Sequence, residues 1–447
     1  MAMTEPTDAA SASTGFGRSD AWRWSICVLL LLATVVNYMD RLTTNNLARR
    51  IQDEFVLNNE EYGNLELGFG LAFAAGSLLF GWLVDRIGVY WLYPSVLIGW
   101  SAMGFLTGLS RSYGELMALR IVLGLFEAGH FPCGLKTVQR LMRPRDRALG
   151  NSLLQAGTAL GAILAPQAIK LLLTDGPGGW RRPFLVIGAG GTAWVILWLI
   201  ALRPSDLRDH HPAEAEVNHD PTRPGTGWPG FWRLAASRRF LALAILVICI
   251  NLNWHLWRVW LPKFLVEARG YGENSMLDFT TYYYIAADAG ILIGGAISAW
   301  LARRGWSQYA SRISVFAGCC FLTTLTTAVA VLPAGPLFVT ALMLVGFGGL
   351  GTFAAFYTLT QDLSVEHQGK LSGSLATITW LVTAAVQPIF GIYLDRTHDY
   401  NFVLGLAGWF PVLALIAVLT LWTRTPDESK PIPITSPPLP QQGLRIP

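Results

Sequence analysis

The stretch WSICVLLLLATVVNYMDRLTTNN, residues 24–46, decides the fold. No charged residue occurs from Trp24 to Val36, and a helix needs about 20 largely apolar residues to cross a bilayer. Asp40 and Arg41 then stand side by side near the end of the run. An ionisable side chain at membrane depth costs about 2.5–3.5 kcal/mol on insertion scales, so it tends to face the protein interior or an aqueous cavity. The stretch therefore predicts a transmembrane helix that carries an acid and a base.

Apolar runs of the same kind recur along the whole chain. Of its 447 residues, 52% are hydrophobic and only 14% are charged, whereas roughly a quarter are charged in a soluble domain. Apolar windows bounded by polar residues, Pro or Gly predict twelve spans, at 21–45, 60–84, 90–109, 113–137, 147–172, 181–202, 237–265, 278–302, 308–332, 335–361, 368–393 and 399–422. The sequence therefore predicts an all-α, multi-pass membrane protein.

The spans form two sets of six with a polar segment between them. We expect an N-terminal tail at 1–20, a six-helix bundle at 21–202, a linker at 203–236, a second six-helix bundle at 237–422 and a C-terminal tail at 423–447. The halves echo each other, because GWLVDRIG corresponds to AWLARRGW and ALRIVLGLFEAGHF corresponds to ALMLVGFGGLGTF. Such echoes predict two pseudo-symmetric bundles with a substrate site where they meet.

The placement of lysine and arginine predicts the orientation. These residues are more frequent in the loops on the side of the two termini, above all in LKTVQRLMRPRDRAL. By the positive-inside rule, both termini are expected in the cytoplasm. Residues 1–17 lack the pattern of a cleaved signal peptide, and no transit or retention signal is found. We expect a monomer in the inner (plasma) membrane of a cell, most simply a bacterial one.

The neighbouring pair in the first span has two interpretations. In one, it lies at the membrane interface, where the Arg41 side chain reaches the headgroups. In the other, Arg41 binds an anion and Asp40 takes up and releases a proton. Adjacent helical residues point about 100° apart, so the two side chains can serve different partners. A guanidinium can hold a carboxylate with two hydrogen bonds, and Tyr38 supplies a neutral partner nearby.

The fourth predicted span holds a second base and acid, in RIVLGLFEAGHFPCG. Arg120 and Glu127 lie on one face of the helix but two turns apart, which is too far for a tight mutual pair. We expect each to pair with another helix. Glu127 stands among apolar residues, which suits a proton carrier. The alternative is a structural ion pair, for example between Arg120 and Asp40. Both can hold, because a proton relay needs a counter-charge that can be exchanged, and we therefore count Arg120 with Asp40 and Glu127 among the proton-coupling residues.

A glycine-bounded motif, GWLVDRIG, follows the second span. Its glycines, Gly81 and Gly88, allow helices to approach closely, while Asp85 and Arg86 can bond a helix end or a partner span. The motif predicts a latch for one gate of the protein. A plain short loop is the alternative.

These motifs resemble a known family. GWLVDRIG resembles the loop signature of the major facilitator superfamily, although Val89 and Tyr90 replace the basic pair that usually follows. NYMDR together with RIVLGLFEAGHFPCGLKTVQRLMRPRDRALGNSLLQAG is similar to the anion:cation symporter family within it, which includes bacterial hexuronate and galactonate transporters. The resemblance covers nearly the whole chain and is most specific at 37–172.

The resemblance implies the major facilitator fold and proton-coupled uptake of an organic anion. By the family's motif, Asp40 and Glu127 match the proton-coupling acids. Arg41 matches the ligand of the substrate carboxylate, and Tyr38 matches a cavity residue.

Two positions depart from the sugar-acid transporters of that family. Phe73 stands where many of them have a tyrosine, and Ala376 stands where an asparagine is common. Both changes make the pocket less polar, so the resemblance names no particular substrate. Gln155 lies in the fifth span, within the region of closest resemblance, and is a further substrate-binding candidate.

The seventh span, NLNWHLWRVWLPKF, supplies candidates from the second half. Asn253, Trp254 and Trp257 fall on one side of a helix and predict a polar and aromatic wall of the substrate site. Trp260 and Lys263 are typical of anchors at the membrane interface.

Other polar residues of the second half have competing interpretations. His255 can bind substrate or titrate near neutral pH, or it can be structural. Asp288 can pair with Arg258, and we favour a structural role for that pair. Gln361 and Trp380 are further candidates for binding substrate.

The sequence favours transport over catalysis. It has no HExxH motif, no nucleophile elbow and no clustered metal ligands, and GFGGLG at 346–351 lies inside a span without a preceding strand. We expect no enzymatic activity, cofactor, metal or nucleic-acid partner.

The predicted function is proton-coupled symport by alternating access, with a sugar acid or another small carboxylate as the substrate. One alternative is an antiporter for phosphorylated sugars, whose dianionic phosphate favours two arginines in the cavity, with Arg258 as the second. The other is a membrane sensor of sugar phosphates that transports nothing.

Overall fold

The computed structural model describes residues 18–143, 145–207, 228–363 and 368–422. Within these ranges the chain is helical and no strand occurs. Twelve helical segments are long and apolar enough to cross a membrane. The prediction of twelve spans is confirmed, and most span ends lie within a few residues of those expected. The predicted tails lie almost wholly outside the described residues.

The first half contains eight helices: α1 (Asp20–Asn46), α2 (Ala48–Phe55), α3 (Asn59–Ile87), α4 (Val89–Thr107), α5 (Tyr113–Glu127), α6 (His130–Leu141), α7 (Arg147–Leu172) and α8 (Arg181–Ala201). The predicted linker begins with a 3-10 turn, η1 (Pro204–Leu207), and ends with α10 (Trp228–Ala235). The second half contains α11 (Arg238–Lys263), a π-helical turn η2 (Phe264–Ala268), α12 (Glu273–Arg303), α13 (Gln308–Thr324), α14 (Thr326–Val331), α15 (Pro336–Gly351), α16 (Phe353–Leu363), α17 (Gln368–Thr397), α18 (Tyr400–Ala407) and α19 (Phe410–Leu421).

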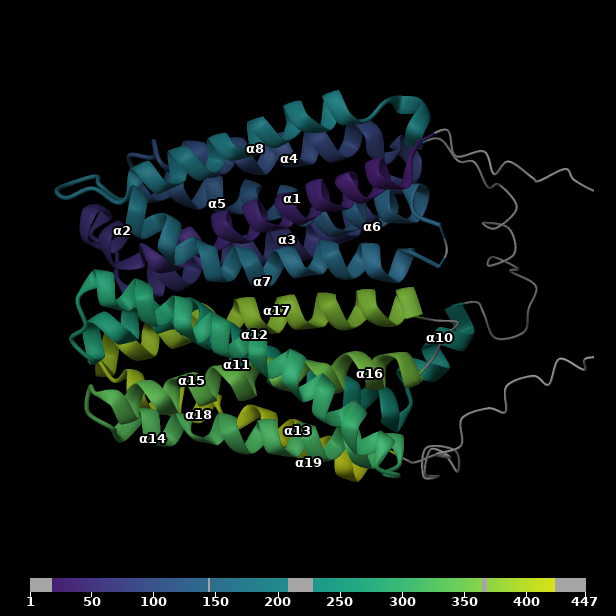
Figure 1. Ribbon diagram of the computed structural model, residues 1–447. Helices are drawn as coiled ribbons and strands as arrows, with labels where there is room; N and C mark the ends of the chain where they lie inside the picture. Colours follow the sequence, from purple (N-terminus) through teal and green to yellow (C-terminus); the bar gives the residue numbers. More distant parts are fainter. Residues whose placement is uncertain (1–17, 144, 208–227, 364–367, 423–447) are drawn as a thin grey trace, which may run out of the picture.

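The helices form two bundles that lie side by side (Figure 1). α1–α8 make one bundle and α11–α19 make the other, and α3 packs on α17 and α7 on α12 across the boundary. The pseudo-symmetry expected from the sequence is visible in the fourth and tenth spans. The fourth breaks after Glu127 and the tenth after Gly351, at corresponding points of the two echoing segments. We call the two ends of the molecule the α2 end and the α10 end, after the short helices that mark them in Figure 1.

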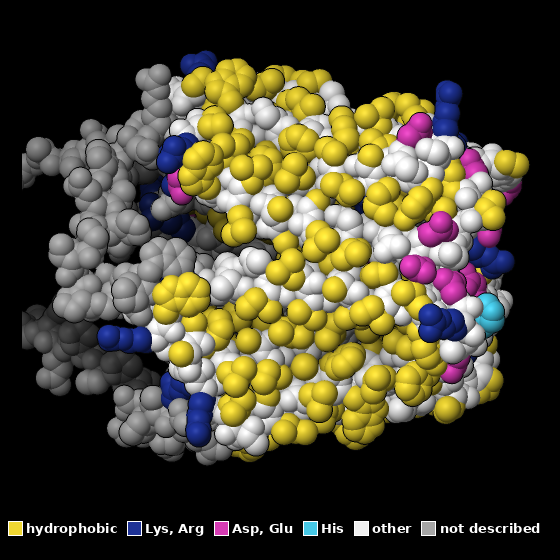
Figure 2. Space-filling model, turned by 180° about the vertical axis from the view of Figure 1, so that it is seen from behind, with side chains coloured by type: hydrophobic (Ala, Val, Ile, Leu, Met, Phe, Trp, Pro, Cys, Tyr) yellow, Lys and Arg dark blue, Asp and Glu magenta, His cyan; other side chains and the backbone are white. Residues whose placement is uncertain are grey.

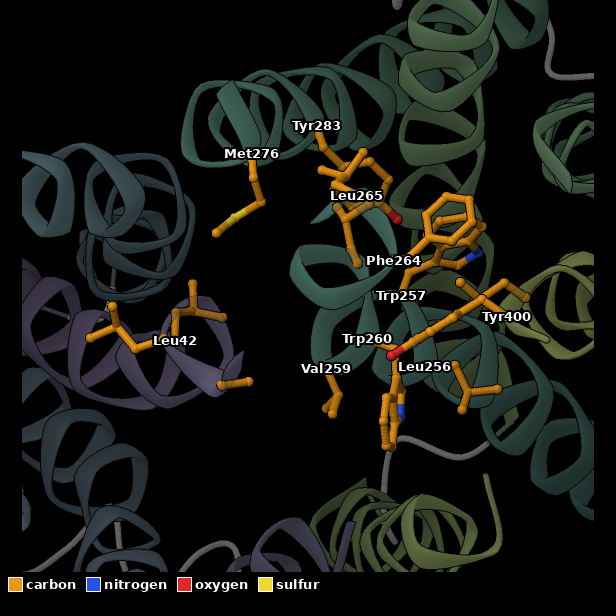
Figure 3. Close-up of a cluster of buried hydrophobic side chains, with 14 of the residues drawn as sticks. Leu42, Leu256, Trp257, Val259, Trp260, Phe264, Leu265, Met276, Tyr283 and Tyr400 are labelled. Atoms are coloured by element: carbon orange, nitrogen blue, oxygen red, sulfur yellow. The ribbon is translucent and has the colours of Figure 1, made fainter. Parts of the chain in front are cut away.

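The apolar cores show that the halves are joined at the α2 end. One cluster contains buried side chains of both halves, among them Leu42 of α1, Trp260 of α11 and Met276 of α12 (Figure 3). The other two clusters are built of buried residues from one half each. Figure 2 shows a hollow between the halves at the α10 end. The molecule is therefore packed shut at the α2 end and open at the α10 end.

Ion pairs across the boundary also gather at the α2 end. Two nitrogens of the Arg50 guanidinium, Nε and Nη2, donate to the Glu273 carboxylate at 2.8 and 2.7 Å. Lys170 Nζ donates to both oxygens of Asp278, at 2.8 and 2.7 Å. Asp395 of α17 accepts from the backbone N–H groups of the first two residues of α3, at 2.9 Å each. A carboxylate from one half thus caps a helix of the other.

Two residues assigned to the membrane interface lie inside this closure instead. Trp260 is fully buried and donates to Gln387 Oε1 at 2.8 Å. Lys263 is 3% exposed and donates to Asn59 Oδ1 at 2.6 Å, across the boundary. The expectation of interfacial anchors was wrong, because the end of α11 packs against the first half, where Trp260 meets the ring of Tyr62 and Lys263 bonds Asn59.

The α2 end is closed tightly enough to require glycine where α3 crosses α17. A Cβ at Gly63 would lie 2.6 Å from the carbonyl oxygen of Gln387, closer than real contacts allow. Gly63→Ala should therefore loosen this closure. A cysteine in place of the buried Asn46, which lines a pocket of about 360 Å³ at this end, should then react several-fold faster with a membrane-impermeant maleimide. The five native cysteines are buried, so background labelling should be low.

The matched control is Gly190→Ala in the same cysteine background, because a Cβ at Gly190 meets no atom within 4 Å. The control should leave the labelling rate unchanged. Equal rates in the Gly63→Ala variant and the control would contradict the tight crossing.

Candidate functional site

An ion pair inside the first half joins α1 to α5. Arg41 Nε and Nη2 both donate to Glu127 Oε2, at 2.9 and 2.6 Å, and both side chains are almost fully buried. Glu127 is the last residue of α5, and α6 begins only at His130, so the acid lies beside a break in the span. The expectation that Glu127 pairs with another helix is confirmed. The interfacial interpretation of Arg41 is wrong.

Aromatic rings enclose the Arg41 guanidinium. Its carbon Cζ lies 4.9–5.6 Å from four ring centroids, those of Tyr38, Phe69, Phe73 and Trp380. A guanidinium within about 6 Å of a ring centroid is attracted by the ring, more strongly where water is excluded. Trp380 belongs to α17 in the second half. Arg41 therefore lies at the boundary between the halves, beside two of the predicted binding residues.

Asp40 points to a different helix, as adjacent residues on α1 must. It is 2% exposed, and a Cβ at Gly104 of α4 would lie 2.9 Å from its Oδ1. Among the described residues, neither oxygen of Asp40 has a hydrogen-bond partner. The proposed ion pair of Arg120 with Asp40 does not form. A buried carboxyl without a partner is far less costly neutral than ionised, so this geometry fits the protonated form of Asp40.

A third acid, Glu66 of α3, holds the remaining arginines together. Arg120 Nη2 donates to Glu66 Oε1 at 2.7 Å, and Arg258 Nη2 donates to Glu66 Oε2 at 3.2 Å. Asn45 Nδ2 donates to the same Oε1 at 3.0 Å. Arg258 belongs to α11 in the second half, so its bond to Glu66 is a buried ion pair that links the two halves.

Glu66 was not among the residues singled out from the sequence. The signal that identified Asp40, an acid within an apolar run, is also present in NLELGFGLAF. The predicted pair of Arg258 with Asp288 is contradicted, because Arg258 bonds Glu66. Oδ2 of Asp288 has no hydrogen-bond partner among the described residues.

The predicted wall on α11 lies mostly within the second half. Trp257 is fully buried and packs against the rings of Phe264 and Tyr283 (Figure 3). Asn253 is also fully buried, next to the position that a Cβ of Gly349 would take. Trp254 is half-buried beside Tyr283. Of the polar residues of α11, Arg258 reaches the first half by its bond to Glu66, and His255 lies beside Arg258 and Trp380.

His255 lies between the charge cluster and the aromatic rings. Its Nδ1 is 3.3 Å from Arg258 Nη2. A guanidinium can only donate, so Nδ1 accepts and the neutral ring carries its proton on Nε2. The ring centroid lies 5.1 Å from that of Trp380, one of the rings around Arg41. The structure thus brings Arg41, Trp380, His255 and Arg258 into one continuous surface.

Two further predicted binding residues also lie outside this cluster. Gln155 of α7 and Gln361 of α16 are exposed side chains, and their role in binding stays a prediction. His130 is not part of the cluster either. Unlike His255, it bonds Thr34 and Tyr93 within the first half.

The glycine-bounded motif contacts its own half in this structure. Asp85 accepts from Lys136 of α6 at 2.9 Å, and Arg86 lies over the Trp82 ring at 4.4 Å. Gly88 has φ 84°, which only glycine adopts easily, and a Cβ at Gly81 would meet no atom within 4 Å. Asp85 and Lys136 also line a pocket of about 540 Å³. A latch between the halves stays a prediction.

The cluster is suited to binding and releasing charge. Breaking a buried ion pair by removing one partner costs about 3–5 kcal/mol, unless another ion replaces it. An anion that offers a carboxylate to Arg41 can supply that replacement, and a proton can supply it to Glu127. Among the described residues, no group of three or more His, Cys, Asp or Glu side chains could hold a metal ion.

Comparison with known proteins places the chain in a family. Residues 30–385 match the Major Facilitator Superfamily. A Cupriavidus necator protein named a probable sulfoacetate transporter is 26% identical, over 91% of this chain and 96% of its own length. A Bacillus subtilis protein named a probable galactarate/D-glucarate transporter is 24% identical, over 94% and 98%. The hexuronate transporter of Escherichia coli K12 is 24% identical, over 90% and 93%.

Solved structures show the same fold. A bacterial homologue of the human lysosomal transporter Spinster superposes with a TM-score of 0.76 at 17% identity, over 91% of this chain and 100% of that chain. The nucleoside transporter NupG superposes with a TM-score of 0.68 at 12% identity, over 89% and 100%. The expectation of a transporter rather than an enzyme is confirmed, and the chain belongs to the Major Facilitator Superfamily.

Proposed function

We propose that this protein imports a small organic anion together with protons, by alternating access. The protein is an organic-anion transporter of its superfamily, similar to hexuronate and galactonate transporters. The observation that carries the proton coupling is the buried pair of Arg41 and Glu127 at the boundary of the halves. One cation there has two possible anionic partners, a titratable acid of the protein and the carboxylate of a substrate.

The proposed cycle follows from charge balance. When Glu127 takes up a proton, Arg41 loses its counter-ion and is free to bind the substrate carboxylate. The substrate then neutralises the arginine, so the halves can rock around a site without a new unpaired charge. Asp40, which has no hydrogen-bond partner in the described part of the chain, serves as a second proton carrier. Release of substrate and protons on the other side restores the ion pair.

The positive-inside rule, applied to the basic loops, supports an orientation with the α10 end in the cytoplasm. The closed α2 end then faces outward, and the structure corresponds to an inward-open state. In a bacterium the protein would lie in the inner membrane. Import requires that the contacts at the α2 end break and that the halves meet at the α10 end, where Asp85 and Arg86 are available for a latch.

The names of the relatives support small acids as substrates. They include sulfoacetate, galactarate, D-glucarate and hexuronates. A phosphate antiporter is less favoured, because it needs arginines without competing acids, whereas each buried arginine of the cluster is bonded to a glutamate. A sensor would bind the same ligands without moving them.

Uptake by the full-length protein in proteoliposomes tests the proposal. With the outside more acidic than the inside, D-glucarate, D-galactonate, D-glucuronate and sulfoacetate are offered separately as labelled probes. We expect accumulation of at least one of them, abolished by a protonophore and absent from empty liposomes. Uptake at the same rate and to the same level with and without the proton gradient would contradict proton symport. Binding without uptake would indicate a sensor instead.

A further inference from the structure

Arg258 is held more loosely than the other arginines of the cluster. It is 4% exposed, yet its bond to Glu66 is 3.2 Å long, whereas the bond of Arg120 to the same carboxylate is 2.7 Å. Nε and Nη1 of Arg258 have no hydrogen-bond partner within the described ranges, and the same two atoms of Arg120 have none either, so the longer bond to Glu66 is what sets Arg258 apart. Buried guanidinium N–H groups are normally bonded. Arg258 thus has donors to spare while Arg120 keeps Glu66 ionised and paired.

A second donor lies beside it. Since Nδ1 of His255 accepts from Arg258, Nε2–H of the neutral imidazole is a donor. The imidazole packs on Trp380, and the Arg41 guanidinium packs on the same indole, with 5.1 and 5.6 Å to its centroid. One small molecule lying along that ring can therefore reach Arg41 at one end and the donors of His255 and Arg258 at the other.

The net charge of the cluster indicates how many anionic groups the substrate carries. Within the described part of the chain, the cluster holds three buried guanidiniums, two ion-paired carboxylates and one carboxyl that has no hydrogen-bond partner: Arg41, Arg120, Arg258, Glu66, Glu127 and Asp40. With that last carboxyl neutral, one positive charge is uncompensated. When Glu127 is protonated as well, two positive charges are uncompensated. A monoanion would leave one charge unbalanced in a medium where that is costly, whereas a dianion balances both.

We infer that the substrate is a small dianion, with one acid group bound by Arg41 and the other by Arg258 with His255. This inference rests on the proposed function and narrows its substrate class. In the empty protein Glu66 holds Arg258 in place. In the loaded protein the second acid group takes over Arg258, while Glu66 stays with Arg120 and Asn45. Carboxylates and sulfonates both satisfy this chemistry, because each offers several acceptor oxygens to a guanidinium.

Matched ligand pairs test the inference by calorimetric binding to the purified full-length protein. The pairs differ by one anionic group: D-glucarate with D-gluconate, succinate with butyrate, and sulfoacetate with acetate. For at least one pair the dianion should bind about tenfold tighter or more, the scale of one charge-assisted contact. Arg258→Gln should remove that preference and leave binding of the monoanion within about threefold. Arg304→Gln, at an exposed arginine of the same half, should keep the preference.

A double variant covers the risk that Arg258→Gln does not fold. Glu66→Gln combined with Arg258→Gln removes one charge of each sign, and it too should bind both members of a pair equally. A dianion preference that survives in either variant would overturn the inference, as would a wild-type protein that binds monoanions as tightly. If monoanions alone are bound and accumulated with protons, the inference fails and the proposed function stands. If no organic anion is bound or transported, both fail.

Discussion

Glu127→Gln should remove the part of proton-driven accumulation that depends on the proton carried by Glu127, while leaving exchange of substrate intact. Glutamine has the shape of protonated glutamate and cannot ionise, so Arg41 stays free for substrate and no proton is carried at this position. In proteoliposomes with a pH difference of one unit, each coupled proton is worth about 1.4 kcal/mol, or about tenfold accumulation. The variant carries no proton on residue 127, so it should lose one such tenfold factor of accumulation. Counterflow, in which labelled substrate exchanges with unlabelled substrate inside, should continue at a rate comparable to that of the wild type.

The control for this experiment is Glu115→Gln. Glu115 lies on the same helix but is exposed at its first turn, so this variant should accumulate substrate normally. Undiminished proton-driven accumulation by Glu127→Gln would exclude Glu127 as a coupling residue. Loss of counterflow as well would show that Glu127 is needed for binding or for the conformational change itself.

Arg41→Gln should cause the largest loss of substrate affinity of any single change. A buried charge pair with its ligand is worth about 2–5 kcal/mol, which corresponds to roughly 30-fold to several thousandfold in the dissociation constant. Arg41→Lys keeps the charge but cannot donate two parallel hydrogen bonds. Its substrate affinity should therefore lie between those of the wild type and Arg41→Gln. Direct binding of the acid that the wild type binds most tightly, measured by calorimetry, gives these values.

Two further variants separate affinity from folding. Arg49→Lys, at an exposed residue of α2, should bind as the wild type does. Arg41→Gln leaves Glu127 without its partner, whereas the double change with Glu127→Gln removes both charges and should restore stability without restoring binding. A double variant that binds substrate normally would show that Arg41 is not the ligand of the carboxylate.

The transmembrane architecture follows from the sequence because lipid imposes it. Each span must be apolar and about 20 residues long, so windows such as 147–172 coincide with helices of the structure, here α7. The break of the fourth span after Glu127 is different. Pro132 in the first turn of α6 and Gly129 in the break itself interrupt the helix there, but the direction of the break depends on how α5 and α6 pack against other helices, which periodicity does not reveal.

The candidate site was only partly predictable. Arg41 and Glu127 stand out because charges in apolar runs are rare, but which acid meets which base depends on the packing of helices far apart in sequence. For this reason Arg120 and Arg258 were assigned the wrong partners, and Glu66 was overlooked. The predicted wall on α11, whose role in binding stays a prediction, was harder to place for another reason. That helix is surrounded by other helices, so apolar and aromatic residues cover all its faces and its inward side has no periodic signature.

The central claim is that Glu127 and the substrate compete for Arg41, and proton uptake on binding tests it most directly. Calorimetric titrations at one pH in buffers of different ionisation enthalpy count the protons taken up. If the loaded protein holds the proton on Glu127, affinity falls as pH rises, by up to about tenfold per pH unit for one proton. The account predicts uptake of about one proton per bound substrate in the wild type at a pH where Glu127 is ionised in the free protein, and none through this residue in Glu127→Gln. Binding to the wild type without proton uptake, or the same uptake in the variant, would contradict it.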